Sequence, residues 1–89
     1  MIKERFEKED RAKILLKQMQ NCRFDIRLLR GKIKDEEIWR AHLSTRNDEE
    51  SKERMQESAR KTTDLAEKIQ RGEEMFENLR QERNKISNR

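Results

Sequence analysis

The fold is decided by residues 12–33, which read AKILLKQMQNCRFDIRLLRGKI. Apolar side chains recur in this stretch at alternating spacings of three and four, the a and d positions of a heptad repeat. They are Ala12, Leu15, Met19, Cys22, Ile26, Leu29 and Ile33. Residues at these spacings share one face of an α-helix, and three heptads without a polar residue on that face are typical of a helix that packs along its length against another. The stretch therefore predicts a coiled-coil type of helix.

A second, less apolar heptad run covers residues 55–86. Its a positions are Met55, Thr62, Ile69, Phe76 and Arg83, and its d positions are Ser58, Leu65, Gly72, Leu79 and Ile86. The first frame, if it continued, would place an a position at Arg54, so the two runs are offset by one residue. That offset turns the apolar face by about 100° on a straight helix. A local irregularity between the runs, a skip or a turn, is therefore expected.

The connecting residues 44–54 contain no apolar side chain and allow two interpretations. Asn47, followed three residues later by Glu50, resembles a helix-capping box and would start a second helix after a turn near 44–48. Asp48–Lys52 and Glu50–Arg54 are acid-first pairs at helical spacing, and the stretch has no Gly or Pro. These pairs favour one continuous helix, with an antiparallel helical hairpin as the alternative.

Composition supports long helices rather than a compact globular core. Charged residues make up 47% of the 89 residues and apolar residues 30%, which is little apolar surface to offset the entropy of ordering the chain. The chain has no Pro and is rich in good helix formers. We expect an all-α fold in three parts. These are a first helical segment (1–43), a polar connector or continuous helix (44–54) and a second helical segment with a weaker seam (55–89).

The residues that could carry catalysis or bind a cofactor are few. His42 and Cys22 are the single histidine and the single cysteine, and they lie about 30 Å apart if one straight helix carries both. A zinc site needs about four ligands at characteristic spacings, and Gly31 and Gly72 are isolated rather than part of a phosphate-binding loop. We expect no enzymatic activity, no cofactor and no metal.

A basic stripe, defined by Arg23, Arg27, Arg30 and Lys34, follows helical spacings of four, three and four. One interpretation is an electrostatic contact with an acidic protein surface, with nucleic acid or with an anionic membrane. The other is a flanking face that pairs with acids of a neighbouring helix. Both interpretations remain open from the sequence.

An outer apolar face, defined by Phe24, Leu28, Ile38 and Trp39, lies outside the heptad seam. Phe24, Leu28 and Ile38 fall on the side of the helix opposite Ile26 and Leu29. Scattered apolar residues on a surface are ordinary. Large aromatic residues, however, often anchor interfaces, and their presence favours docking of a further helix or a larger surface.

We expect the chain to be a structural or scaffolding segment that mediates protein–protein assembly with itself or with another coiled-coil protein, without a small-molecule substrate. The apolar seam would drive association through Leu15, Met19, Cys22, Ile26, Leu29, Ile33, Leu65, Ile69, Phe76 and Leu79. In pattern and composition the chain resembles segments of long cytoskeletal, centrosomal or ciliary coiled-coil proteins. We expect it to be a piece of a longer protein. A lone thiol suits a reducing compartment, so we expect a cytoplasmic location, with the nucleus as the other compartment of this kind. No apolar stretch approaches the length of a membrane span. The alternative function is a basic helical module that binds nucleic acid or an anionic membrane.

Overall fold

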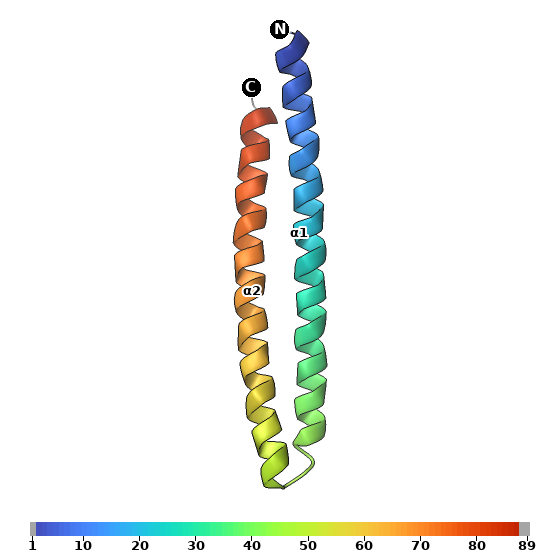
Figure 1. Cartoon of the computed structure of the whole chain (residues 1–89), viewed down its shortest axis with the longest axis vertical. Helices are drawn as coiled ribbons and strands as arrows, with labels where there is room; N and C mark the ends of the chain where they lie inside the picture. The colour runs from blue at the N-terminus through green and yellow to red at the C-terminus, as the bar shows by residue number, and fades with distance from the viewer. Residues whose placement is uncertain (1, 88–89) are drawn as a thin grey trace.

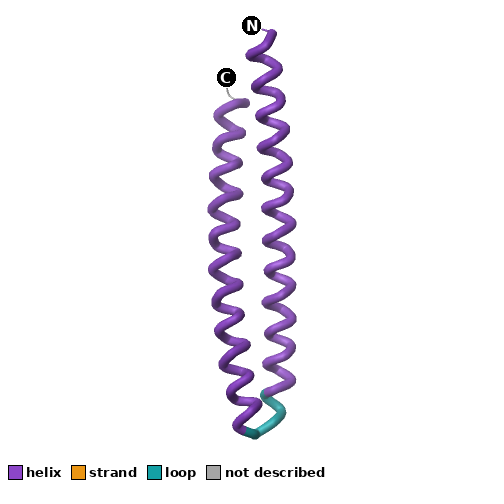
Figure 2. The backbone as a smooth tube through the Cα atoms, viewed as in Figure 1, coloured by secondary structure: helices purple, strands orange, loops and turns teal. Residues whose placement is uncertain are grey.

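The computed structural model describes residues 2–87, with side-chain burial defined for residues 7–86. Two helices make up this part of the chain, α1 (Ile2–Leu43) and α2 (Glu49–Ser87). They run side by side in opposite directions, joined by a short loop at one end (Figures 1 and 2). At 1.5 Å per residue, the 42 residues of α1 extend about 63 Å. The fold is an all-α antiparallel helical hairpin; residues 1, 88 and 89 of the expected segments lie outside the described residues.

The expectation of one continuous helix through residues 44–54 is wrong, because the chain turns between Leu43 and Glu49. The end of α1 is closed by short-range bonds, in which the amides of Thr45 and Arg46 donate to the carbonyls of His42 and Leu43. The Ser44 hydroxyl donates to the carbonyl oxygen of Ala41 at 2.7 Å. Hydroxyl side chains that bond nearby carbonyls offer the backbone an alternative to further helix, so a turn forms here without Gly or Pro.

The first turn of α2 is capped by Asp48, one residue later than the predicted Asn47. Its Oδ1 accepts a hydrogen bond of 3.1 Å from the backbone N–H of Ser51, satisfying one of the free amides at the helix start. The Glu50–Arg54 pair, 2.8 Å apart, lies wholly inside α2. This pair is therefore equally compatible with a hairpin and with an unbroken helix, so it did not support the expected continuous helix.

Close contacts fix the register of the two helices. Ile26 lies opposite Gly72, and Arg40 hydrogen-bonds Ser58. Ile26 and Arg40 are fourteen residues apart on α1, and their partners Gly72 and Ser58 are fourteen residues apart on α2. The register is therefore constant over these two heptads. The a positions of α1 face the d positions of α2. The turn absorbs the one-residue offset between the heptad frames.

The interior has an apolar part and a polar part. Leu15, Met19, Cys22 and Ile26 are buried in the half nearer the chain ends, and Leu43 is buried beside the turn. Between them, four residues at a and d positions bond across the two helices: Glu36, Arg40, Ser58 and Thr62. The polar interruptions of the α1 seam therefore face the polar interruptions of the α2 seam. A matched polar layer of this kind favours one register over its neighbours.

Candidate protein-binding surface

The apolar seam is filled within the chain itself. Leu15, Met19, Cys22 and Ile26 are buried, and the other six members are half-buried: Leu29, Ile33, Leu65, Ile69, Phe76 and Leu79. These positions face the other helix of the hairpin. The seam thus packs within the hairpin, and the most exposed large apolar side chains lie elsewhere on the molecule.

Cys22 is part of the packing between the helices. Its thiol donates a hydrogen bond of 3.0 Å to the backbone carbonyl of Gly72. Burial raises the pKa of the Cys22 thiol, and the nearby charge of Asp25 raises this pKa further. The thiol therefore faces α2.

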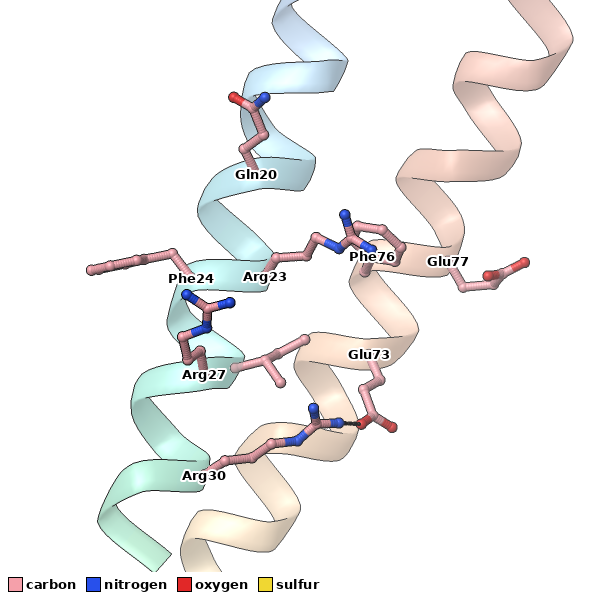
Figure 3. A pocket seen from close by; sticks show the side chains of 9 residues that line it. Gln20, Arg23, Phe24, Arg27, Arg30, Glu73, Phe76 and Glu77 are labelled. Carbon is pink, nitrogen blue, oxygen red and sulfur yellow. Dashed lines mark hydrogen bonds and ion pairs between the residues drawn. The ribbon is translucent and has the colours of Figure 1, made fainter.

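Two members of the basic stripe contact α2. Arg30 forms an ion pair of 2.8 Å with Glu73, and the Arg23 guanidinium carbon lies 5.2 Å from the centre of the Phe76 ring (Figure 3). The Arg30 and Glu73 side chains are each more than half exposed, so their pairing contributes at most about 1 kcal/mol. This placement is the flanking role that was one of the two interpretations of the stripe.

The other two members, Arg27 and Lys34, are exposed. Within the described residues no ion pair joins either of them to an acid. Arg27 lines an open groove of about 830 Å³ between the helices, together with Phe24, Phe76 and Glu77. Arg27 and Lys34 are thus the two members of the stripe that no ion pair, hydrogen bond or cation–π contact joins to α2 in the described part of the chain, and both are exposed to an external acid.

The outer apolar face lies on the side of α1 turned away from α2. Phe24, Leu28 and Ile38 are 60%, 51% and 62% exposed, and Figure 3 shows the Phe24 ring pointing away from α2. Ile14, also more than half exposed, lies two heptads before Leu28 and extends the same face. Ile14 was not among the residues predicted for this face. Its fourteen-residue spacing from Leu28 was the signal that could have found it.

Trp39 differs from the other three members of the outer apolar face. It is 41% exposed and lines a shallow hollow whose α2 side includes Glu57 and Ser58. Its ring also stacks on the ring of His42, with centroids 5.8 Å apart. Trp39 therefore lies at the edge of the face, where α1 meets α2.

The corresponding outward face of α2 is entirely polar. Its exposed positions at spacings of three and four are Glu57, Arg60, Asp64, Glu67, Arg71, Glu74, Asn78, Gln81 and Lys85. The outward positions thus include apolar side chains on α1 but hold only charged or amide side chains on α2. Met75 of α2, which is 57% exposed, lies beside this outward face rather than on it. This asymmetry makes the outer apolar face the candidate site of the molecule.

Neither helix, over residues 2–87, carries an apolar stretch long enough to cross a membrane. The described residues also bring together no group of three or more His, Cys, Asp or Glu side chains suited to a metal ion. Comparison of the chain with known protein families, with curated proteins and with solved structures gave no match. The class of the molecule, a helical hairpin with one apolar outer face, therefore rests on the sequence and the fold.

Proposed function

We propose that the chain is a non-catalytic helical-hairpin module that mediates protein–protein assembly, and that it binds its partner through the outer apolar face of α1. The observation that carries this proposal is the exposure of Phe24, Leu28 and Ile38 on one face, set against the polar outward face of α2. Apolar side chains gathered on one surface mark interaction sites more often than singly scattered ones do.

The spacing of the exposed residues supports a helical partner. Leu28 follows Phe24 by four residues and Ile38 follows Leu28 by ten, so all three recur at heptad positions. A helix laid along α1 would cover them in turn, as in a three-helix bundle. The chain's resemblance to cytoskeletal, centrosomal or ciliary coiled-coil segments supports a place in such an assembly in the cytoplasm.

The alternative, a basic helical module for nucleic acid or an anionic membrane, has less support. It would draw its affinity from the basic stripe, and Arg23 and Arg30 are engaged with α2. No aromatic residue other than Phe24 lies among the bases to stack on unpaired nucleotides. Protein binding accounts for the apolar residues, which nucleic-acid binding leaves without a role.

The proposal is tested by site-specific photocrosslinking in cells that contain the native chain. A photoreactive phenylalanine analogue replaces Phe24 in one variant and Glu67, on the outward face of α2, in the matched control. We expect position 24 to give discrete adducts that protease destroys and nuclease leaves intact, and position 67 to give few. Circular dichroism of both purified variants would verify that the hairpin is retained.

Three results would contradict the proposal. Adducts from position 24 that are sensitive to nuclease would assign the face to nucleic acid. Adducts with lipid alone would assign it to a membrane. Equal adduct patterns from positions 24 and 67 would show that the outer apolar face has no preferred partner.

A further inference from the structure

We propose that the partner is an amphipathic helix whose apolar seam is flanked by acidic residues, and that it lies along α1 to complete a three-helix unit. This inference rests on the proposed function and specifies the chemistry of the partner. Three features support it. They are the open space above Gly31, the positive charge around the outer apolar face, and the lack of a complementary surface on a second copy of the chain.

Gly31 occupies the centre of the outer apolar face, three residues after Leu28 and seven before Ile38. A glycine inside a helix is less favourable than alanine by about 1 kcal/mol, and a close contact is one reason for glycine at such a position. Gly72 has such a contact, because a Cβ there would lie 3.0 Å from the Cγ1 atom of Ile26. A Cβ at Gly31 would meet nothing within 4 Å. The hairpin gives no packing reason for Gly31, whereas a helix seated on the face could place a side chain above it.

The exposed side chains around the face carry a positive excess. Over residues 13–38, the exposed positions of α1 hold seven bases and three acids. The bases are Lys13, Lys17, Arg23, Arg27, Arg30, Lys32 and Lys34, and the acids are Asp25, Asp35 and Glu37. A helix seated on this face would place the residues beside its own seam near these bases. Acidic residues there would be attracted, and basic residues would be repelled.

A second copy of the chain does not meet these requirements. Two copies joined through the same face would bring two positive surfaces together, which opposes association. The outward face of α2 has acids, such as Glu67 and Glu74, but no apolar residue to cover Phe24 or Leu28. The complementary surface must therefore come from a different chain or from a part of the protein outside these 89 residues.

An anionic membrane fits the face less well than a helix. Membrane-surface helices bury a broad apolar face in the lipid interface. Here the apolar positions form a narrow row interrupted by Lys17, Asn21 and Asp35, all exposed. A carboxylate within the row, at Asp35, would be unfavourable against lipid.

The test measures binding of the full 89-residue chain to two synthetic helical peptides by fluorescence anisotropy. The peptides share one apolar heptad seam and carry glutamate in one and lysine in the other at the flanking positions. We expect the glutamate peptide to bind at least ten-fold more tightly at low salt, with the ratio falling as salt increases. The double variant Arg27→Glu/Lys34→Glu should reverse the preference. The matched control Lys61→Glu/Lys68→Glu, on α2, should leave it unchanged.

A second set of variants tests the geometry. Gly31→Gln should weaken binding of the glutamate peptide at least ten-fold while the melting temperature of the hairpin holds or rises, because glutamine favours helix over glycine. Phe24→Gln/Leu28→Gln should weaken binding of both peptides. Glu67→Gln/Glu74→Gln should change neither.

The outcomes separate this inference from the proposed function. Equal affinity for the two peptides, or no binding to either, would overturn the acid-flanked partner, while crosslinking at position 24 would still decide whether the face binds protein. Sedimentation showing a dimer that Phe24→Gln dissociates would overturn it in favour of self-association. Tighter binding to vesicles containing phosphatidylserine than to the glutamate peptide would overturn it in favour of a membrane.

Discussion

Replacing Gly72 with alanine tests the helix register on which the whole hairpin depends. The new Cβ would lie 3.0 Å from the Cγ1 atom of Ile26, which is tighter than ordinary van der Waals contact, and 3.4 Å from its Cδ1 atom. Alanine gains about 1 kcal/mol of helix propensity over glycine. Overfilling a packed site costs about 1–3 kcal/mol, so the net effect on stability should range from neutral to a loss of about 2 kcal/mol.

Gly31→Ala is the matched control for Gly72→Ala. The same helix-propensity gain applies at Gly31, and nothing within 4 Å resists the added methyl group. We expect Gly31→Ala to stabilise the hairpin by about 1 kcal/mol. In a domain of this size each kcal/mol shifts the melting temperature by roughly 4–8 °C, a difference that circular dichroism resolves easily.

A double-mutant cycle with Ile26→Ala isolates the contact. Ile26→Ala alone should destabilise the hairpin by about 2–5 kcal/mol, since it removes a buried side chain. In that background Gly72→Ala should become stabilising, because the atoms that it would crowd are gone. The reasoning would be refuted if Gly72→Ala stabilised the wild-type chain as much as Gly31→Ala does, with no coupling to Ile26.

Three further predictions concern the turn, the thiol and the polar layer. Hydrogen bonds from Ser51 lower the pKa of Asp48 in the folded chain. The cap therefore stabilises the fold at pH values above the Asp48 pKa of the unfolded chain, and this stabilisation is lost as pH falls through the folded pKa. Asp48→Asn should remove this pH dependence of the melting temperature, and an Asp48→Ala variant with the melting temperature of the wild type would contradict the cap. Cys22 should react with iodoacetamide far more slowly in the folded chain than in denaturant, because its thiol is buried and its pKa is raised; equal rates would show that the seam is open. Arg40→Met should destabilise the hairpin by about 1–3 kcal/mol in urea denaturation, since it leaves oxygens of Ser58 without their donor, and unchanged stability would mean that water replaces the arginine.

The helical class of the fold could be predicted from spacing alone. Burial follows the a and d frames because those positions recur on one side of a helix, as Leu15, Met19 and Ile26 illustrate. The turn was harder, since acid-first pairs such as Glu50–Arg54 form within α2 whether or not the chain turns before it. The one-residue offset between the two heptad frames indicated a local irregularity, because it would rotate the apolar face of a straight helix by about 100°. A skip within one helix and a turn both accommodate that offset, so the offset alone did not predict the turn.

The polar layer could not be predicted from either segment by itself. Arg40 interrupts the first seam and Ser58 the second, and each alone predicts a weaker association. Their complementarity depends on the antiparallel register, which places the Arg40 guanidinium 3.1 Å from the Ser58 carbonyl oxygen. Contacts between residues far apart in sequence arise from the topology. Each segment alone therefore showed a polar residue that weakens its seam, whereas in the structure these two residues hydrogen-bond each other.

The two helices differ in the number of apolar faces that they carry, and this difference determines which side of the hairpin a partner would cover. α2 has one apolar side, which α1 covers, and its outward side is solvated by residues such as Glu67 and Arg71. α1 has a second row that includes Phe24 and Leu28, which α2 cannot reach because it already occupies the opposite side. A partner that covers this row would bury apolar area without disturbing the seam. Assembly should therefore add to the stability of the hairpin rather than compete with it.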